Sequence, residues 1–491
     1  MRQLKSILHS NGHPLIVLYG AWKDYAIKNL NKDPAINIGP TVSFNVVRYD
    51  GSYVGCSEVA KLASLSNPPI QFRTGCFCNP GACHEALKLS EEQVKDHYIF
   101  GGHVCGDEKD VIDGVPTGAI RVSFGKDSIW EDMDVMVSFL KQYFLNDKRA
   151  PSLLLNSMMK DERRTLEQKE EKQLSQMYIF PIKSCGAFRV KKWNINSRTG
   201  KLAYDREFCL YCSGSAMRMQ SNPKMCLISP EVDLENNQLI VKAPCCENLV
   251  IRLDAEDRGP RSNDIKRTHT KEIMVCGNCH AGHVWGDRHV SDWFSSFLGV
   301  RCFLAWSDTR QAVHPPKPLI SQPFKLQDRI NHKRLESLTK RQNIAFANDA
   351  PLLLISKESV NILNAKSASQ HHKLANTLHF RPNFVVQNSS EDVCKDEEEY
   401  MPYLNPEDIW TKLYFKRQKL ELINEGPCAR CAMVDFDPTS GTKGKTLRTL
   451  ADYRRNNGHI NFGIFLRGSD SNAHLPEEIL IEEGDFIIAI S

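Results

Sequence analysis

The order of apolar and polar residues predicts an N-terminal region that mixes helices with strands, followed by a longer region of short strands. In the N-terminal region, strand-like composition and helical spacing of apolar residues separate the two kinds of element. The predicted strands are residues 41–49 and 119–124, and the predicted helices are residues 57–66, 91–100 and 129–144. This mixture predicts an α/β subdomain over residues 1–145.

Two polar segments interrupt the apolar pattern and are interpreted as domain boundaries. Residues 146–176 mix charges of both signs and contain few apolar residues, which predicts a linker with little surface to bury. Residues 308–344 are polar and rich in proline, which predicts a second connecting segment. Residues 177–307 and 345–491 then remain as two domains.

Short apolar runs separated by turn residues predict that both of these domains are β-rich. In the first domain the predicted strands are residues 177–181, 188–195, 207–211, 225–228 and 238–242, with a closing helix at 290–298. In the second domain the predicted strands are residues 352–356, 383–387, 413–423, 433–437 and 486–490.

Composition and charge exclude several functional classes. Of the 491 residues, 41% are hydrophobic and 25% are charged, which is ordinary for a soluble globular protein. The net charge of +4, without a basic patch interleaved with aromatic residues, argues against a nucleic-acid partner. The apolar run Leu15–Tyr19 is too short for a signal-peptide core, and the other apolar runs are strand-sized, which argues against a membrane span. The 17 cysteines, without a secretion signal, predict reduced thiols and a cytoplasmic protein.

The segment Arg73–Cys83 carries the most distinctive chemistry, because it places three cysteines within eight residues beside glycine and proline. Gly75, Pro80 and Gly81 predict a loop, and a loop gives a thiol the access and mobility that a nucleophile needs. Arg73 is a nearby cation that would favour the thiolate. Two structural interpretations stay open at this point, namely three buried cysteines in a turn and a small metal knuckle.

A second cysteine-rich segment has the spacing Cys-x-x-Cys-His-x-x-His. Its residues are Cys276, Cys279, His280 and His283. The spacing suits zinc ligands, although a structural zinc site normally combines two such clusters. The alternative is an ordinary strand and turn, and the spacing alone does not decide between them.

The motif Arg-Thr-Gly-x-x-Cys resembles the active-site loop of one branch of the cysteine desulfurases, which are class V aminotransferase-like enzymes. The full string from Arg73 to Cys83 looks like the eukaryotic molybdenum cofactor sulfurases in particular. Residues 102–107 and 110–118 match the same family. The resemblance implies that Cys78 is the nucleophile, which takes sulfur from L-cysteine as a persulfide.

The same resemblance implies a substrate-binding role for Arg121 and Arg73. Arg121 matches the arginine expected to hold the substrate carboxylate, and the fork of a guanidinium suits a planar carboxylate. Cys76 and Cys83 are neighbours of Cys78 without a defined role.

The pyridoxal phosphate domain of this family has no counterpart in the residue pattern. Its Schiff-base lysine normally follows a histidine upstream of the cysteine loop, whereas the His-Lys pairs here begin at His332 and His372, downstream of that loop. Pyridoxal phosphate supplies the electron sink that weakens the carbon–sulfur bond of cysteine. We therefore expect a truncated isoform or a partial gene model. A true short protein that receives sulfur in trans is the alternative.

Two further stretches resemble the MOSC proteins, which are named for the molybdenum cofactor sulfurase C-terminus. Residues 178–185 and 202–207 resemble their N-terminal β-barrel. By that match, Lys183, Ser184 and Arg206 contact the molybdenum cofactor. Cationic and hydroxyl side chains suit the phosphate and the polar pterin edges of this cofactor.

Residues 380–386 and 426–431 resemble the core motifs of the MOSC domain itself. The residues carried over by this match as cofactor contacts are Arg381, Asn383, Arg430 and Cys431. Cys431 matches a thiolate ligand of molybdenum, a suitable soft ligand. Whether Cys431 serves as ligand, as sulfur relay or as both stays open.

Together the resemblances imply the C-terminal part of a pyridoxal phosphate aminotransferase-like fold, followed by a β-rich MOSC N-terminal barrel and a MOSC domain. The implied activity is a sulfurtransferase that passes sulfur from Cys78 to bound molybdenum cofactor, replacing an oxo ligand with sulfido. The implied recipients are xanthine dehydrogenase and aldehyde oxidase. For residues 276–283, the family pattern favours a strand and turn over zinc.

Two other functional classes stay open. One is a binding or carrier module for molybdenum cofactor without desulfurase activity. The other is an oxidoreductase similar to the amidoxime reductases, in which the MOSC domains are themselves catalytic. The desulfurase-like loop around Cys78 argues against this second class.

Overall fold

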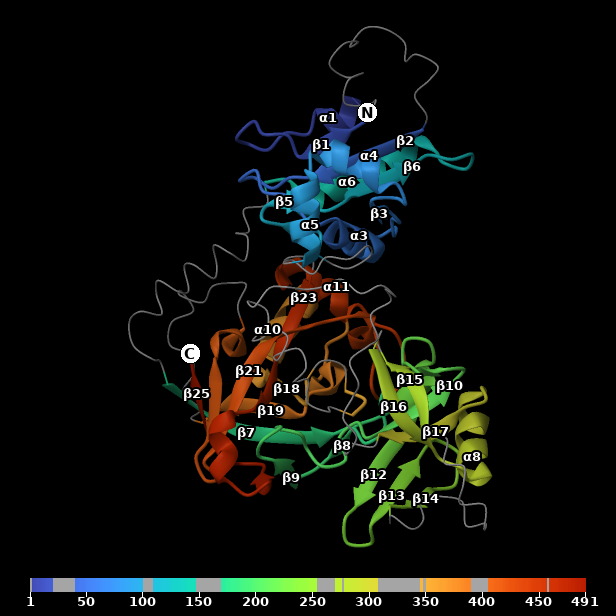
Figure 1. Cartoon of the computed structure of the whole chain (residues 1–491), viewed down its shortest axis with the longest axis vertical. Coiled ribbons are helices and arrows are strands. Elements are labelled where there is room, and N and C mark those ends of the chain that lie inside the picture. Colours follow the sequence, from blue (N-terminus) through green and yellow to red (C-terminus); the bar gives the residue numbers. More distant parts are fainter. Residues whose placement is uncertain are drawn as a thin grey trace. The chain divides into compact units, whose positions relative to one another are not determined.

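The computed structural model divides the chain into two compact units (Figure 1). Unit 1 comprises Met1–Leu166 with Arg455–Ile460, and unit 2 comprises Glu167–Arg454 with Asn461–Ser491. The residues that the structure describes are 2–20, 40–99, 109–146, 169–253, 270–275, 278–307, 345–347, 350–389, 405–456 and 459–491. Each unit is described by itself.

Unit 1 is a mixed α/β region built on an antiparallel sheet with the order β1-β2-β6-β3. Its strands are β1 (Ile16–Tyr19), β2 (Thr41–Val46), β3 (Arg73–Gly75), β4 (Val111–Ile112), β5 (Val115–Pro116) and β6 (Ala119–Ser123). Its helices are α1 (Arg2–Lys5), α3 (Cys56–Leu65), α4 (Pro80–Leu87), α5 (Glu91–Ile99) and α6 (Trp130–Phe144). Helix α6 contributes Phe139, Leu140 and Phe144 to the core, where Phe44 of β2 is also fully buried. The predicted α/β region is confirmed.

The first part of unit 2 is a closed barrel with the strand order β10-β11-β15-β16-β17. These strands are β10 (Phe208–Cys212), β11 (Ser215–Ala216), β15 (Thr270–Val275), β16 (Asn278–Val284) and β17 (Phe303–Ser307). A small sheet, the helix α8 and the 3-10 helix η1 accompany the barrel. They are β12 (Ser229–Asp233), β13 (Gln238–Lys242), β14 (Leu249–Arg252), α8 (Arg288–Leu298) and η1 (Pro223–Leu227).

The second part of unit 2 is built on a nine-stranded sheet with the order β18-β19-β7-β25-β20-β21-β23-β22, with β8 paired to β7. Strand β22 and the first two residues of β23 fall within Arg455–Ile460, the range that belongs to unit 1. Its strands are β7 (Lys169–Ile179), β8 (Phe188–Arg189), β18 (Leu352–Ser356), β19 (Phe384–Asn388), β20 (Lys412–Phe415), β21 (Leu420–Ala429), β22 (Arg455–Asn456), β23 (His459–Gly468) and β25 (Phe486–Ile490). The other elements are α10 (Lys357–Ser369), α11 (Thr446–Tyr453), η2 (Thr377–Phe380), η3 (Pro406–Ile409), η4 (Ala432–Asp435), η5 (Asp470–His474) and the paired strands β9 (Lys192–Asn196) and β24 (Glu478–Glu482).

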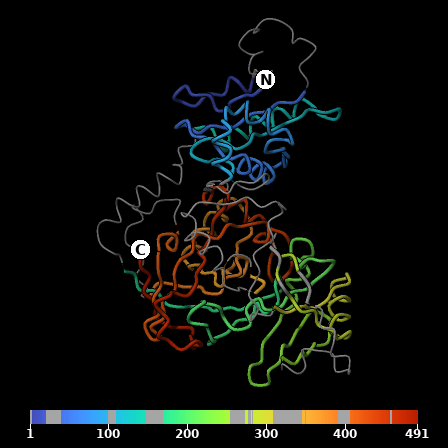
Figure 2. The backbone as a smooth tube through the Cα atoms, viewed as in Figure 1, coloured from blue at the N-terminus to red at the C-terminus, as the bar shows by residue number. Residues whose placement is uncertain are grey.

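Strand β7 ties the two parts of unit 2 together. It precedes the barrel in the sequence, yet it pairs with β19 on one side and with β25 on the other (Figures 1 and 2). One apolar cluster runs through both parts, from Phe208 and Phe294 of the barrel part to Phe384 and Phe415 of the sheet. The two β-rich parts therefore share a hydrophobic core.

Several predicted elements differ from the structure. Residues 225–228 and 433–437 were predicted as strands, but they fall largely in the 3-10 helices η1 and η4. An apolar run of four or five residues is too short to distinguish the period of a helix from that of a strand. Pro223 has a fixed φ, which favours a turn at the start of η1. The predicted strand 413–423 is a hairpin, because the chain turns at Lys419 with a positive φ. Residues 169–176 of the predicted linker belong to β7.

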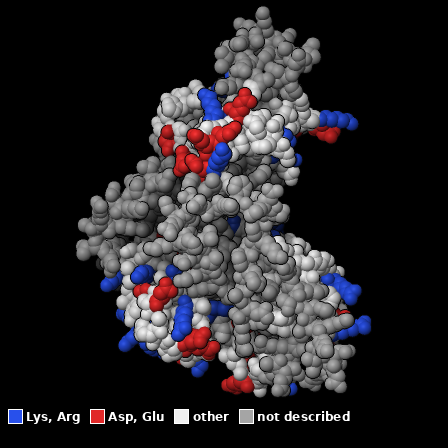
Figure 3. All heavy atoms as spheres, in the orientation of Figure 1, with Lys and Arg blue, Asp and Glu red and all other residues white. Residues whose placement is uncertain are grey.

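Residues 147–168 of that linker and the whole of the predicted bridge 308–344 lie outside the described residues, so the domain boundaries stay predictions. Within the described residues, no helix has both the length and the apolar character needed to cross a membrane. On the face shown in Figure 3, lysine and arginine side chains lie among aspartate and glutamate side chains.

Candidate functional site

Cys78 lies at the tip of the turn that connects β3 to α4. Phe77 and Cys78 adopt left-handed backbone angles, with φ of 54° and 60°. The amide of Asn79 donates to the carbonyl of Cys76 at 2.9 Å and closes the turn. Two successive non-glycine residues in this conformation hold the Cys78 side chain away from the strand. The thiol of Cys78 is exposed.

The prediction of a loop as far as Cys83 is wrong, because α4 begins at Pro80. Proline suits the first turn of a helix, where its missing N–H leaves no hydrogen bond unmade. The side chain of Asn79 caps the helix by accepting from the amide of Ala82 at 3.4 Å. Cys78 therefore stands two residues before the first residue of α4.

The two arginines predicted to bind substrate occupy neighbouring strands. Arg73 of β3 is paired with Arg121 of β6 in the antiparallel register. Arg73 is exposed, whereas the guanidinium carbon of Arg121 lies 4.9 Å from the centre of the Phe77 ring. This cation–π contact places Arg121 beside the Cys78 turn.

Beside this turn is a cavity of about 500 Å³. Its lining includes Tyr19, Cys76, Cys83 and Arg121, but Cys78 is not part of it. Burial raises the pKa of the Cys83 thiol, and the neighbouring Cys76 thiol acts in the same direction. Cys78 is therefore the exposed thiol of the three, while the other two belong to the cavity wall.

Pyridoxal phosphate does not fit the residues that the structure describes around this cavity. Its lining there contains no lysine that could form a Schiff base. Arg121 is a suitable carboxylate partner, because its Nε is buried without a hydrogen bond to any other described residue. We derive no step through pyridoxal phosphate.

A close backbone contact between β3 and the residue before β6 supports the Cys78 turn. A Cβ atom on Gly118 would lie 2.8 Å from the Cα of Gly75, so β3 and the start of β6 approach this closely only because residue 118 is glycine. Asn45 of β2 donates to the carbonyl of Gly118 at 3.0 Å and to the hydroxyl of Tyr19 at 3.1 Å. These contacts fix the strand end from which the Cys78 turn projects.

In unit 2, the ring of Phe180 lies between two of the predicted arginines. The guanidinium carbons of Arg206 and Arg381 are 4.8 Å and 4.2 Å from the centre of this ring. Arg206 also donates to the side chain of Asn383 and to the backbone carbonyl of Arg381, both at 3.2 Å. It forms an ion pair with Asp205. The structure therefore brings Arg206, Arg381 and Asn383 together.

Asn383 and Arg430 use their polar atoms on the backbone. The fully buried Asn383 donates to the carbonyl of Tyr178 at 3.2 Å and accepts from the amide of Leu353 at 3.1 Å. Arg430 donates from Nε to the carbonyl of Phe462 at 2.8 Å, and from Nη1 to Phe380 at 3.0 Å. Both residues hold neighbouring segments in place.

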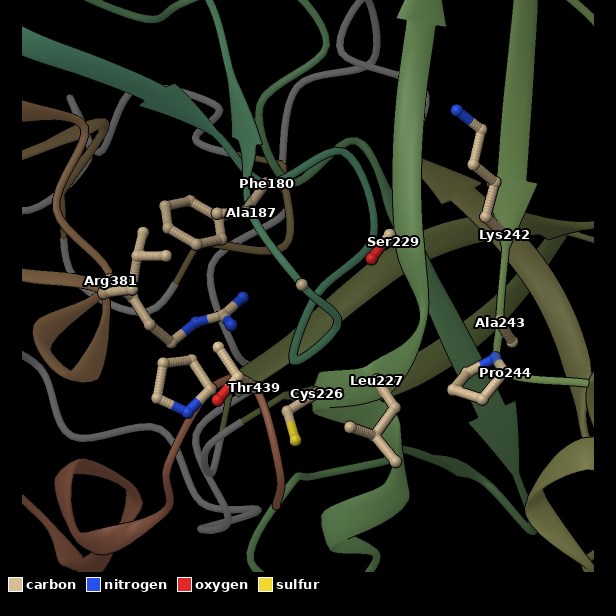
Figure 4. Close-up of a pocket in the computed structure, with 13 residues that line it drawn as sticks. Phe180, Ala187, Cys226, Leu227, Ser229, Lys242, Ala243, Pro244, Arg381 and Thr439 are labelled. Atoms are coloured by element: carbon tan, nitrogen blue, oxygen red, sulfur yellow. The ribbon is translucent and has the colours of Figure 1, made fainter. Parts of the chain in front are cut away.

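Arg381 faces a cavity of about 470 Å³ (Figure 4). Its Nη1 donates to the carbonyl of Cys185 at 2.6 Å. Burial lowers the pKa of Arg381 to about 9, and the neighbouring charge of Arg206 acts in the same direction. Among the seven predicted cofactor residues, all of which are described, Arg381 is the one that lines this cavity.

Lys183, Ser184 and Cys431 complete the predicted set. Lys183 is buried, and its Nζ donates to the carbonyl of Phe346 at 2.9 Å. Ser184 is buried with a φ of 65°. Cys431 is exposed, and its sulfur accepts from Nε2 of Gln220 at 3.3 Å. The sequence interpretation gave no role to Gln220, because a single glutamine in a turn carries no recognisable signal.

The charge balance of this cluster favours an anion. In the described part of the chain, Asp205 is the only carboxylate that hydrogen-bonds to Arg206, Arg381 or Arg430. Burial lowers the pKa of Arg381 and of Arg430, because desolvation disfavours their charged forms. A ligand with a phosphate group fits the Arg381 side of this cluster.

The predicted segment 276–283 remains undecided as a metal site. The side chains of Cys276 and Cys279 lie outside the described residues. Within the described residues, no group of three or more histidine, cysteine, aspartate or glutamate side chains is placed to hold a metal ion.

Two family models match unit 2. Residues 171–301 match the MOSC N-terminal beta barrel domain, and residues 341–487 match the MOSC domain. Full-length comparison finds a molybdenum cofactor sulfurase of Arabidopsis thaliana that is 34% identical over 486 residues, covering 95% of this chain and 53% of the relative. The chain is a homologue of the molybdenum cofactor sulfurases.

Other relatives give the same result. A molybdenum cofactor sulfurase of Aspergillus clavatus is 32% identical over 94% of this chain and 56% of its own length, and molybdenum cofactor sulfurase 2 of Culex quinquefasciatus is 32% identical over 98% and 56%. The chain spans about half the length of the curated relatives it matches. A solved Bacillus subtilis structure, YUAD, covers 66% of this chain and 99% of its own at 10% identity, with a TM-score of 0.26.

Proposed function

We propose that unit 2 binds molybdenum cofactor at the cavity beside Arg381, with Arg206 behind it. The observation that carries this proposal is the buried guanidinium of Arg381, which faces a cavity of about 470 Å³ and hydrogen-bonds to no carboxylate among the described residues. An anionic cofactor group would stabilise that charge. The match to both MOSC domains of the sulfurase family supports the same assignment.

The surroundings of each residue indicate its role in cofactor binding. Arg381 would bind the anionic group, while Arg206 orients Arg381 through its backbone carbonyl. Lys183 and Ser184, on the loop after β7, would contact further polar edges. Cys431 offers an exposed thiol as a soft ligand, held by Gln220. When bound, the cofactor supplies the molybdenum centre that receives sulfur.

We further propose that Cys78 carries the transferable sulfur as a persulfide. Its thiol is exposed, lies at the N-terminal side of α4 and is held in a left-handed turn. The complete pathway is carried over from the family as a proposal, from L-cysteine to cofactor for xanthine dehydrogenase or aldehyde oxidase. The alternative is a carrier that binds cofactor but transfers no sulfur.

The cofactor proposal is tested by binding measurements on arginine variants. We expect Arg381→Ala to weaken binding of molybdenum cofactor by roughly tenfold or more, because a charged hydrogen bond to an anion is lost. Arg381→Lys should recover part of the affinity. Arg189→Ala is the matched control, since Arg189 is exposed and pairs with Glu483 on the surface. Equal affinity of the Arg381→Ala and Arg189→Ala variants would contradict the site.

The sulfur-carrier proposal is tested with a cofactor-dependent recipient that lacks its sulfido ligand. The chain is loaded with a small persulfide, and activation of the recipient is measured. We expect Cys78→Ala to abolish activation, because the exposed carrier thiol is removed. Cys245→Ala, which removes another exposed thiol, should leave activation unchanged. If Cys78→Ala activates the recipient as well as Cys245→Ala does, Cys78 is not the sulfur carrier. If no form of the chain activates the recipient although the cofactor binds, the chain is a carrier only.

A further inference from the structure

Cys226 is a thiol in the wall of the Arg381 cavity for which neither the sequence motifs nor the family matches supply a role. It lies in η1, is 4% exposed and lines the cavity together with Arg381 and Thr439 (Figure 4). Its sulfur donates weakly to the carbonyl of Asp437 at 3.7 Å. The thiol is therefore inside the space where the proposed cofactor would bind.

A buried cation, Arg381, lines the same cavity as this thiol. The guanidinium is more than nine-tenths buried, and Figure 4 shows it reaching into the same space that Cys226 borders. Its Nη1 binds the carbonyl of Cys185, while its Nε and Nη2 hydrogen-bond to no other described residue. Two donors of the fork are thus available to an anion in the cavity.

Two effects act in opposite directions on the pKa of the Cys226 thiol. Burial raises the pKa of Cys226, and the charge of Arg381 lowers it. Cys226 therefore rests as a protonated thiol. A negative charge formed on its sulfur would be stabilised by the neighbouring cation of Arg381.

The loop of residues 437–441 packs against Cys226 and is held by its own hydrogen bonds. Asp437 accepts from the amide and the hydroxyl of Thr439, at 2.9 Å and 2.6 Å, and it pairs with Lys373. Gly441 follows with a φ of 68°, and a Cβ there would lie 3.4 Å from the Cys226 sulfur. The Cys226 sulfur thus borders both this loop and the cavity.

We propose that Cys226 is a sulfur-accepting thiol that takes sulfane sulfur from a persulfide inside the Arg381 cavity. Its place in delivery to molybdenum rests on the proposed function. In the step, the sulfur–sulfur bond of the donor R–S–SH breaks and a new one forms on Cys226. The proton of the Cys226 thiol passes to the departing donor sulfur, which leaves as R–SH. Nothing is oxidised or reduced overall.

The direction of transfer follows from the surroundings of the product. A persulfide ionises more readily than a thiol, and the persulfide anion on Cys226 would face the available donors of Arg381. A donor left in solvent has no such partner. Sulfur on Cys226 is therefore stabilised relative to sulfur on a small donor.

The experiment treats the full chain with glutathione persulfide, without molybdenum cofactor, and follows each cysteine peptide by mass spectrometry. Cys185 is the internal control, because it is fully buried and also feels the charge of Arg381 but does not line the cavity. We expect Cys226 to gain one sulfur atom at least about tenfold faster than Cys185. Equal rates at the two sites would overturn the proposal.

Two variants test the mechanism within the same assay. Arg381→Gln, checked for native circular dichroism, should lower the sulfur content of Cys226 about tenfold, the factor that corresponds to one pKa unit. Arg189→Gln, which removes an exposed cation outside the cavity lining, should leave it unchanged. An unchanged sulfur content in Arg381→Gln would overturn the role of the cation. Because no cofactor is present, failure here is separate from failure of cofactor binding.

Discussion

At the scale of single residues, the site depends on side chains whose surroundings the sequence does not reveal. The motifs identify Arg381, Asn383 and Arg430 as a set, but they do not separate the arginine that faces a cavity from the residues that hold backbone carbonyls. That difference arises from tertiary contacts between segments almost 200 residues apart, such as Arg381 with Cys185. The motif predicts Cys78 as the nucleophile, and this stays a prediction, whereas the left-handed backbone that presents its thiol could not be predicted from the sequence.

Glu407 is a second residue whose state is set by its environment. It is fully buried, accepts from Ser356 at 2.8 Å and from Ser359 at 2.6 Å, and adjoins the Asp408–Arg454 ion pair. Burial, followed by the charge of Asp408, raises its pKa from 4.5 to about 7. Between these values the folded chain holds a proton that the unfolded chain releases.

A pH dependence of stability follows for Glu407. The free energy of unfolding should fall as the pH rises from about 4.5 to about 7, by up to roughly 1.4 kcal/mol per pH unit. Glu407→Gln carries a permanent hydrogen and should flatten this slope. Chemical denaturation of both proteins across this pH range is the measurement. A slope that is the same in both proteins would exclude Glu407 as its source.

At the scale of elements, periodicity predicted the long segments and failed on the short ones. The helices near residues 57–66, 91–100 and 129–144 are found as α3, α5 and α6, because each repeats its apolar positions over several turns. The runs at η1 and η4 are too short to show a period, and hydrogen bonds to other segments decide their form. In η4, for example, Asp435 accepts from the amide of Leu447 at 2.7 Å.

The close approach of β3 and β6 makes a prediction at this scale. Gly118→Ala would place a Cβ 2.8 Å from the Cα of Gly75, so the strands must separate. We expect a loss of about 1–3 kcal/mol in the unfolding free energy, together with slower reaction of Cys78 with a thiol reagent as its turn shifts. Gly81→Ala in α4, where a Cβ meets nothing within 4 Å, is the matched control. An unchanged unfolding free energy in Gly118→Ala would contradict the tight contact between the two strands.

At the scale of the whole molecule, the sequence pattern predicts a linker before residue 177, whereas the structure places part of that segment in strand β7. The predicted linker ends in β7, and the family matches begin at residue 171, inside that strand. Local composition assigned these residues to a connector, because charged side chains at exposed positions hide a strand whose pairing partners, β19 and β25, lie far along the chain.

The interior position of β7 has a consequence for how this part of the chain can be divided. A polypeptide cut between the two matched domains separates the C-terminal sheet from one of its own inner strands. Each half would then present an open edge, and recovery would require the halves to recombine by strand complementation. We therefore expect the barrel and the sheet to fold as one cooperative unit, although the family models name them as two domains.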